Sequence, residues 1–414
     1  MLENFLRTRA AIERRSGGLL GPHLDSFVAS LSQLGYARET VQKRLRFLYV
    51  FDRWLVRRGL ALVDLHDAVV SNFLEEQRDN GRLGYGDPQT ARDFLDHLRV
   101  KGVVRSPEPA ADESPVATLG QQYENYLKKE RGLSPITIAH HWQFARRFIV
   151  ERFGDAPICV RDLAPDDISR FLLRHAHSGS PAMAKMMVTA LRSFFRYLFL
   201  SGQTESDLAG AVPSVPDWRL AELPKYLTPE EVEQVVHAYE QDSPAALRNR
   251  AILLLLARLG LRAGEVIALE LDDVDWRVGE LKVRGKGGQH DRLPLPADVG
   301  LAIANYVRHH RPHCSTRRIF VLSKAPYREF AHSTSLSSIV RRAINRVGLH
   351  PHFKGAHVLR HSLATGMLRS GASLDEIGEV LRHRAAHTTA IYAKVDIQGL
   401  RSLALPWPTK EAVP

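Results

Sequence analysis

The chain has 414 residues, and its 57 lysines and arginines against 46 aspartates and glutamates give a formal net charge of +11. Apolar residues make up 44% and charged residues 25%, which is typical of a globular protein and excludes collagen-like, mucin-like and wholly disordered chains. At about 100–200 residues per domain, the length predicts two to four domains. The positive charge favours a polyanionic partner such as nucleic acid, although many basic proteins bind none.

Two features bear on the compartment. Only two cysteines occur, Cys159 and Cys314, so we expect no disulfide framework but two buried, unpaired thiols in a reducing compartment. The N-terminal segment lacks an apolar stretch of signal-peptide length, and the longest apolar run, 251–257, is far short of the roughly 18–20 residues that span a bilayer. We therefore expect a cytoplasmic, nucleoid-associated protein.

Two proline-containing segments divide the chain. Residues 103–116 and 206–226 predict extended linkers, because proline removes backbone donors and disfavours helix. They separate a first block (1–105), a second block (112–210) and a third block (225–414), and we expect each block to be a domain.

The first two blocks resemble copies of one helical design. The matching residues keep their order while the offset drifts from 97 to 100 residues, which favours duplication over chance similarity between amphipathic helices. The matches are Gly35 with Gly132, Thr40 with Thr137, Phe47 with Phe144, Phe51 with Phe148, Leu65 with Leu163, Phe73 with Phe171, Leu74 with Leu172, Phe94 with Phe194, Leu98 with Leu198 and Gly102 with Gly202.

Helices of the second block carry candidate DNA contacts. Ser134 and Pro135 predict a helix N-cap and first turn, and another helix is predicted over 184–199. Basic side chains on the outer faces of both helices could neutralise phosphates, with a solvated helix face as the alternative for each. They are Arg146, Arg147, Lys185, Arg192 and Arg196.

The third block changes pattern along its length. Thr228 and Glu231 predict a capping box. Helices follow over about 245–258 and from near Arg262, then residues 274–296 predict short strands with a hairpin. The chain after these strands reads as mostly helical.

Four segments of the third block contain the candidate chemistry: LGLRAGEV (259–266), VRGKGGQHDRLPL (283–295), HVLRHS (357–362) and LRHRAAHTTAIY (381–392). They supply, in order, Arg262, Lys286, His357, Arg360, His383 and Tyr392. With this order and spacing, residues of about 112–395 resemble the tyrosine recombinase, or phage integrase, family. The resemblance implies a mainly α fold with a small β-sheet, in which two helical, SAM-like DNA-binding domains precede a mixed α/β catalytic domain.

These residue types suit reversible DNA cleavage. A tyrosine hydroxyl, here Tyr392, can conserve the bond energy as a phosphotyrosyl ester. Two permanently charged guanidiniums, Arg262 and Arg360, can hold the non-bridging oxygens of the transition state, so we expect neither a metal nor another cofactor. Family precedent implies a 3′-phosphotyrosyl link and a free 5′-hydroxyl that attacks the partner DNA.

The remaining residues have supporting roles in this prediction. His357 can bind the phosphate or accept the tyrosine proton, Lys286 can protonate the departing 5′ oxygen, and His383 can donate to a non-bridging oxygen. Glu265 either orients Arg262 or caps the local helix, although a surface ion pair between the two is the alternative. Nearby His361 is expected to be structural.

Several positions depart from the family pattern. Arg382 stands where a glycine is usual, Gly366 stands where a second histidine often follows Thr365, and Arg292 is displaced by one residue. With the extra first block, these departures argue against a chromosome-resolving recombinase and favour an integrase or transposase of a mobile element. A metal site at 309–314, where three histidines and Cys314 cluster, is a weaker alternative to a polar helix end.

The resemblance also implies an assembly. We expect a homo-tetramer on two specific double-stranded DNA sites, joined through a Holliday junction, with or without other recombinases of the same element. The tail after Tyr392 is expected to dock on a neighbouring protomer, with its own core as the alternative. Two other functions stay open: a DNA-binding accessory subunit that rarely cleaves, and a type IB topoisomerase-like activity.

Overall fold

The computed structural model describes residues 2–5, 13, 17–106, 114–154, 156–175, 180–215, 225–239, 243–285, 290–351, 353–383 and 385–395, without the side chains of 386 and 387. Contacts between Cα atoms divide the chain into two units, one of residues 1–106 with 220–414 and one of residues 107–219.

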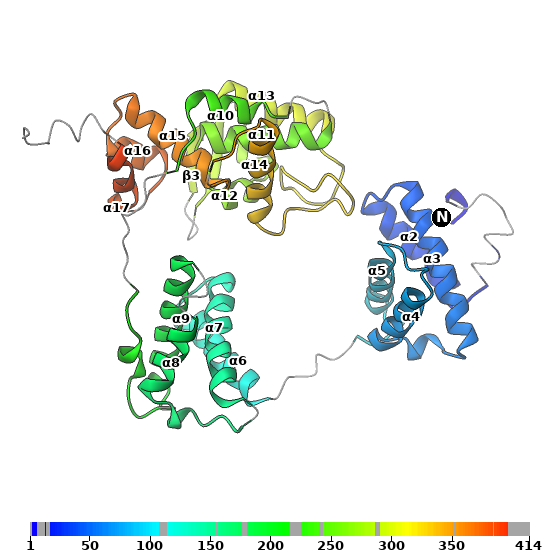
Figure 1. Cartoon of the computed structure of the whole chain (residues 1–414). Coiled ribbons are helices and arrows are strands. Elements are labelled where there is room, and N and C mark those ends of the chain that lie inside the picture. Colours follow the sequence, from blue (N-terminus) through cyan, green and yellow to red (C-terminus); the bar gives the residue numbers. More distant parts are fainter. Residues whose placement is uncertain are drawn as a thin grey trace, which may run out of the picture. The chain divides into compact units, whose positions relative to one another are not determined.

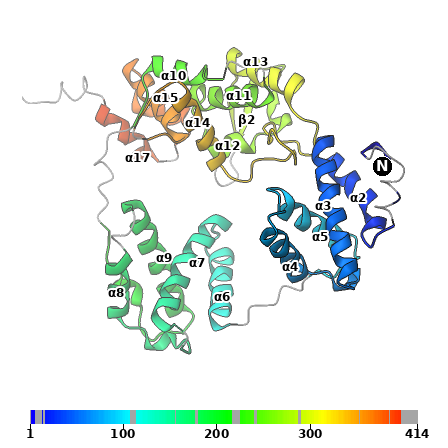
Figure 2. The same ribbon diagram turned by 45° about the vertical axis from the view of Figure 1, so that its right-hand side comes forward.

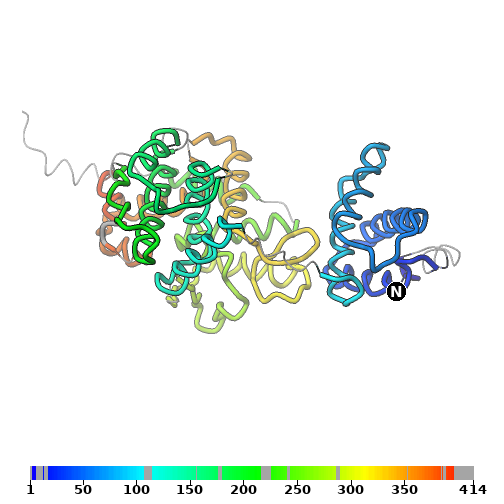
Figure 3. Tube along the Cα trace, turned by 90° about the horizontal axis from the view of Figure 1, so that it is seen from below, coloured from blue at the N-terminus to red at the C-terminus, as the bar shows by residue number. Residues whose placement is uncertain are grey.

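The described part of the first block is helical, and Figure 3 shows its helices, in blue, packed together. Its elements are η1 (Leu2–Asn4), α2 (Gly21–Gln33), α3 (Arg38–Arg57), η2 (Leu62–Asp64), α4 (Asp67–Asp79) and α5 (Asp87–Val100). Aromatic rings fill its core: Phe27 meets Phe94 edge-on at 5.0 Å between centroids, and Phe51 lies 4.7 Å from Phe73. Packing of these rings makes the block a hydrophobic unit of its own.

The second block is a bundle of four main helices, which Figure 1 shows in cyan and green. Its elements are α6 (Pro115–Lys129), α7 (Pro135–Phe153), η3 (Val160–Asp162), α8 (Pro165–His175), α9 (Pro181–Leu200) and η4 (Leu208–Ala211). Tyr123, Phe148 and Phe194 are fully buried between the helices. Ser134 caps α7 by accepting the Thr137 N–H, as its sequence predicts.

Both predicted linkers are shorter than expected. Pro115, which we assigned to the first linker, opens α6 behind the N-cap Ser114. In the second, η4 packs Leu208, Ala209 and the following Val212 into the core of the second block. Proline suits the first position of a helix, where no backbone donor is needed, so Pro115 favours the start of α6. In the second segment, burial of the apolar side chains outweighs the proline signal.

The two blocks share an order of elements: helix, long helix, 3₁₀ turn, helix, helix. The turns η2 and η3 lie 98 residues apart, which is the offset of the neighbouring sequence matches. Every matched leucine and phenylalanine is buried in both blocks. Gly102 and Gly202, which end the last helices, have φ of 70° and 69°, a conformation that favours glycine. These similarities support the duplication, which stays a prediction.

The third block contains most of the remaining structure. Its elements are α10 (Pro229–Val236), α11 (Pro244–Arg258), α12 (Ala263–Ala268), η5 (Leu271–Asp273), β1 (Val274–Asp275), β2 (Glu280–Arg284), β3 (His290–Pro294), α13 (Ala297–Asn305), the π-helix η6 (Tyr306–His310), α14 (Thr334–Arg346), α15 (His357–Arg369), α16 (Leu374–Val380), α17 (Ala386–Thr389) and η7 (Ala390–Val395). Figure 2 shows α10, α13, α14 and α15 around α11, and each of them contacts it. The predicted capping box of Thr228 and Glu231 opens α10.

The apolar α11 is the centre of this block because it is buried on every side from Ala251 to Ala257. The three strands form one antiparallel sheet in the order β1-β2-β3, with Leu281 paired to Leu293 and Arg284 to His290. The predicted strands over 274–296 are therefore confirmed. Residues 286–289, which follow β2 and precede β3 in the chain, lie outside the described residues.

Residues 311–333 contradict the expectation that the chain after the strands is mostly helical. They have no helix and only isolated bridges, such as Val321 with Glu329. Arg311 stabilises this irregular course, because its guanidinium donates to the carbonyls of Thr316, Arg318 and Ile319. A helical pattern in sequence does not reveal these local bonds between a side chain and carbonyls 5 to 8 residues further along the chain.

The structure also tests the predictions about the cysteines and about membrane-spanning segments. Both cysteines are free, but Cys159 is exposed in the turn before η3 and Cys314 only partly buried, so the expectation of two buried thiols is wrong. None of the described helices is both long and apolar enough to cross a membrane.

A matched pair of leucines tests the central position of α11. Leu255→Ala removes a fully buried side chain and should lower the free energy of unfolding by about 2–5 kcal/mol, whereas Leu301→Ala on the exposed face of α13 should change it by less than about 0.5 kcal/mol. Hydrogen exchange of the α11 amides in denaturant measures both. Equal losses for the two variants would show that α11 does not carry the stability of this block.

Candidate active site

Arg262 is held at the start of α12 by Glu265. One carboxylate oxygen of Glu265 accepts the backbone N–H of Arg262 at 2.8 Å, and the other accepts its Nη1 at 2.7 Å. Glu265 is 6% exposed, which rules out a surface ion pair. Burial opposes its ionisation, but the bonds from Arg262 and the charge of Arg382 outweigh burial and hold the pKa of Glu265 below its ordinary value. Glu265 thus both caps the helix and orients the guanidinium.

Arg382 adds a second guanidinium to the same carboxylate. Its Nη2 lies 2.9 Å from Glu265, and its backbone carbonyl accepts from Arg262 at 3.4 Å. Arg382 has a φ of +54° and is the only non-glycine residue with positive φ in the described ranges. This conformation explains why glycine is usual here, since an L-residue pays roughly 1–2 kcal/mol for it.

Arg360 joins three of the four motif segments. It lies on α15, is 5% exposed, and donates from Nη1 to the carbonyl of Gly260 and from Nη2 to that of Leu381. Burial and the nearby charge of Arg262 lower the pKa of Arg360 to about 10, so it remains charged at neutral pH. Its two bonds fix the segments that precede Arg262 and His383.

The two predicted phosphate-binding histidines lie near this pair of arginines. His357 is exposed in the first turn of α15, and the atoms packed around its ring, followed by the charges of Arg360 and Arg262, lower its pKa. His383 places Nδ1 2.8 Å from the hydroxyl of Thr389. Burial, reinforced by Arg360 and Arg262, lowers the pKa of His383 to about 4, so its imidazole is neutral at pH 7.

Tyr392 lies in a small separate core. Its side chain is 1% exposed and packs with Ala364, Ile377 and Leu381, and Figure 1 shows its neighbours α15, α16 and α17 in orange and red. Its hydroxyl is 2.8 Å from Nδ1 of His361. Burial raises the pKa of Tyr392, while the charge of Arg360 opposes this rise. The hydroxyl is therefore sealed from solvent in its protonated form.

His361 is the residue whose part in this site the sequence did not predict. Burial lowers its pKa to about 4, with smaller contributions from His357 and Arg360, so the ring is neutral and can hydrogen-bond the phenol. We expected it to be structural because only its position beside Arg360 marked it. Adjacent helix residues point about 100° apart, which lets Arg360 face the arginine cluster while His361 faces Tyr392.

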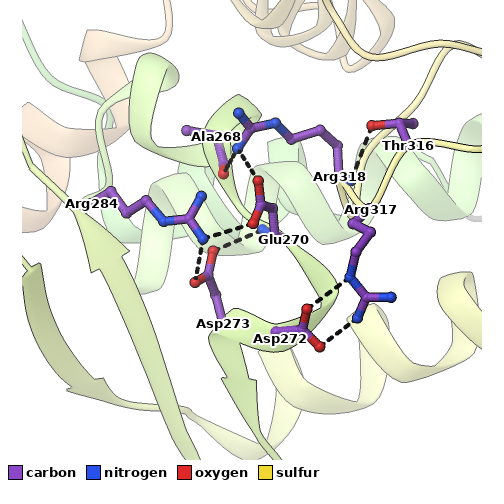
Figure 4. A network of polar contacts seen from close by, with 8 residues as sticks. All are labelled: Ala268, Glu270, Asp272, Asp273, Arg284, Thr316, Arg317 and Arg318. Atoms are coloured by element: carbon purple, nitrogen blue, oxygen red, sulfur yellow. Dashed lines mark hydrogen bonds and ion pairs between the residues drawn. The ribbon is translucent and has the colours of Figure 1, made fainter.

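Lys286 falls outside the described residues, but Arg284 and His290, which lie before and after it in the chain, pair between β2 and β3. Arg284, at the end of β2, binds Glu270 and Asp273 at 2.8 and 3.0 Å. Figure 4 shows this network continuing to Arg318, which binds Glu270 at 3.2 Å and the carbonyl of Ala268. These ion pairs anchor the strand that leads to Lys286 against η5 and the irregular segment.

The five candidate DNA contacts of the second block are exposed, on α7 and α9, but most already have partners. Arg192 donates twice to the carbonyl of Val212, and Arg196 pairs with Asp207 at 3.0 Å, so both hold the chain after α9. Arg147 binds His175 at 2.9 Å, and Lys185 also has an interaction partner. Arg146 has none among the described residues.

Metal ligands do not gather around these residues. In the described ranges, no group of three or more His, Cys, Asp or Glu side chains is arranged to hold an ion. His309 and His310 lie at the end of the π-helix η6, which agrees with a polar helix end.

Comparison with known families gives two matches along the chain. The model of the phage integrase family matches residues 225–398, and that of the phage integrase N-terminal SAM-like domain matches residues 121–202. Neither model reaches the first block.

Individual relatives extend these matches. A Sinorhizobium fredii protein, y4rA, named as an integrase/recombinase, is 40% identical over 98% of this chain and 99% of its own length. Tyrosine recombinase XerD of Mycobacterium tuberculosis is 33% identical over 68% of this chain and 94% of its own.

Two solved structures share the fold. XerH bound to its palindromic difH substrate after cleavage has a TM-score of 0.56 at 22% identity and covers 82% of this chain and 94% of its own. A lambda integrase tetramer bound to a Holliday junction has a TM-score of 0.51 at 21% identity and covers 75% and 87%.

The lowered histidine pKa values predict a pH-dependent stability. Between about pH 6.5 and pH 4, His361 and His383 are protonated in the unfolded chain but remain neutral in the folded chain. The free energy of unfolding should therefore be highest above pH 6.5 and should fall as the pH is lowered toward 4. His361→Gln should flatten this fall, and His332→Gln, which changes an exposed histidine, should not. Urea unfolding at pH 7, 5.5 and 4.5 measures all three proteins; identical pH profiles would contradict the burial of His361.

Proposed function

Because the chain belongs to the phage integrase family of tyrosine recombinases, enzymes that cut and rejoin DNA strands, we propose that it integrates and excises a mobile element. Recombination proceeds at specific sites through a 3′-phosphotyrosyl intermediate and a Holliday junction. The enzyme acts on double-stranded DNA in the cytoplasm, associated with the nucleoid, as a homo-tetramer and with other recombinases of the same element where these are present.

One observation carries this proposal: the buried guanidinium of Arg360 draws together the segments that contain Arg262, His357 and His383. The phosphate binds where these cations and imidazoles meet. The side chain of Arg262 is 40% exposed and contacts the phosphate directly. Arg360 is buried and adds positive charge from the protein interior. Fixed cations of this kind stabilise the charge that develops on the non-bridging oxygens.

The reaction exchanges one phosphoester for another. The hydroxyl oxygen of Tyr392 forms a bond to phosphorus, its proton passes to His357, and the bond from phosphorus to the 5′ oxygen breaks. Lys286 supplies the proton to that oxygen, and His383 donates to a non-bridging oxygen. Because the Tyr392 hydroxyl is buried against His361, segment 386–395 moves to deliver it. Release from His361 therefore precedes cleavage.

The domain arrangement extends the same proposal. The second and third blocks bind the DNA, with Arg146 and neighbouring cations of α7 and α9 on the phosphates, and the first block is a duplicate of the second. The tail after Val395, which lies outside the described residues, docks on a neighbouring protomer. Support for the mobile-element role comes from y4rA, whose match covers nearly the whole chain, whereas the XerD match covers 68% of it.

Substitution of the nucleophile tests the cleavage step. The full-length protein is incubated with sheared genomic DNA of its source, denatured with detergent and recovered with any attached DNA, which is then sequenced. Wild type should carry DNA at a few discrete sites, and Tyr392→Phe, which lacks only the hydroxyl, should carry at least about 100-fold less.

Each alternative function has its own outcome in this assay. An absence of attached DNA in wild type would favour an accessory subunit. Relaxation of supercoiled plasmids that lack the recovered sites would favour a topoisomerase. Attachment that is undiminished in Tyr392→Phe would contradict the assignment of the nucleophile.

Arg382 provides a second test, because it shares Glu265 with Arg262. Arg382→Gly removes the energetic cost of the positive φ, but Glu265 then pairs with Arg262 alone and neutralises more of its charge. The rate of covalent attachment should therefore fall about tenfold, while DNA affinity stays nearly constant. Arg382→Ala separates the two effects, since it removes the guanidinium and keeps the backbone cost. Full activity of both variants would show that the guanidinium is dispensable.

A further inference from the structure

The first block contains a hollow whose lining is strongly basic. It has a volume of about 730 Å³ and is lined by α3, the beginning of α5 and the connection after α4. The charged residues that line it are Lys43, Arg44, Arg46, Arg57, Arg82 and Asp87. We call it the α3 groove.

Two of these charges are already satisfied. Arg44 binds Asp93 at 2.7 Å, and the carboxylate of Asp87 accepts the backbone N–H of Gly84 at 2.7 Å. The other four, Lys43, Arg46, Arg57 and Arg82, are exposed and form no ion pair with any carboxylate in the described part of the chain. The groove therefore offers four exposed cations to a ligand, of which Arg57 also interacts electrostatically with the carboxylate of Glu76.

The spacing of these cations suits an extended polyanion. Lys43, Arg46 and Arg57 fall within roughly 60° of arc on α3, at 100° per residue, so they form one stripe along the helix. At about 1.5 Å per residue the stripe is about 21 Å long. That length corresponds to about six base pairs of duplex DNA at 3.4 Å each. A small anion would contact only one end of it.

The second wall of the groove adds to this fit. Arg82 and the fully exposed Tyr85 project from the turn between α4 and α5. Among the described residues, no buried polar side chain other than Gln77 and Thr90 lines the groove, so it lacks the enclosed polar contacts that position a small molecule. An open, basic and elongated surface is instead typical of phosphate-backbone contacts.

The charges are particular to the first block. At the offset of 97 residues, Lys43, Arg46 and Arg57 correspond to His140, Gln143 and Gly154 of the second block. The apolar partners of the two blocks match, but these three cations do not. The groove is therefore not a by-product of the shared helical design.

From these observations we infer that the α3 groove binds the sugar–phosphate backbone of duplex DNA, as a contact separate from the catalytic site. The inference rests on the proposed function, which places the chain on DNA. The contact is independent of base sequence, since bonds from cations to phosphates carry no sequence information. It extends the length of DNA that one protomer covers.

Salt dependence tests this inference with a matched control. The full-length variant Lys43→Gln/Arg46→Gln/Arg57→Gln removes the stripe, and Arg38→Gln/Lys101→Gln/Arg105→Gln removes three exposed cations of the same block that lie outside the groove. The probe is a mixed-sequence duplex of about 40 base pairs. Circular dichroism and thermal unfolding verify that both variants fold.

Each phosphate contact contributes about 0.9 to the slope of log affinity against log salt. Loss of three contacts should reduce the slope by about 2.7, so that between 50 and 200 mM salt wild type loses roughly 40-fold more affinity than the groove variant. The control variant should keep a slope close to that of wild type. Equal slopes for the groove variant and wild type would overturn the inference, as would a loss of self-association without any change in DNA binding.

The covalent-attachment assay separates this inference from the proposed function. If Tyr392-dependent attachment persists while the groove variant keeps the wild-type slope, the groove inference fails and the recombinase function stands. If the slope falls as expected but wild type never becomes attached to DNA, the groove contact stands and the proposed cleavage function fails.

Discussion

The buried guanidinium of Arg360 is the interaction on which the site depends. A cation taken out of water costs several kcal/mol unless its donors are satisfied. Here the carbonyls of Gly260 and Leu381 accept two of them, and each carbonyl lies two residues before a predicted phosphate-binding residue, Arg262 or His383. The same bonds that make the buried charge tolerable therefore set the positions of Arg262 and His383, which we propose bind the phosphate.

A surplus of positive charge surrounds this centre. Glu265 is shared between Arg262 and Arg382, so one carboxylate balances only part of the charge of the arginines. His361 and His383 remain neutral, each with a pKa of about 4, because burial disfavours their charged forms and the charge of Arg360 adds to this effect. The arginine cluster is thus positively charged without any ligand, while Tyr392, the proposed nucleophile, lies apart in its own small core. The proposed cleavage therefore requires a movement that brings Tyr392 to the arginines.

Local patterns predicted local structure well. Thr228 with Glu231, Ser134 with Pro135 and the paired strands within 274–296 all formed as expected, because each depends on residues close in sequence. Contacts over long separations could not be predicted in this way. The bonds of His361 to Tyr392 and of Arg360 to Gly260 depend on which faces tertiary packing brings together. The bonds of Arg311 within 311–333 span few residues, but they occur in an irregular segment that no periodic pattern marks.

The most direct test of this account is the chemical identity of the attachment. Digestion of the covalent complex with nuclease and trypsin, followed by tandem mass spectrometry, locates the nucleotide on a peptide. The account predicts a nucleotide joined through its 3′ phosphate to Tyr392, the only tyrosine of the tryptic peptide 385–394. A nucleotide on another tyrosine, or one joined through its 5′ phosphate, would contradict it.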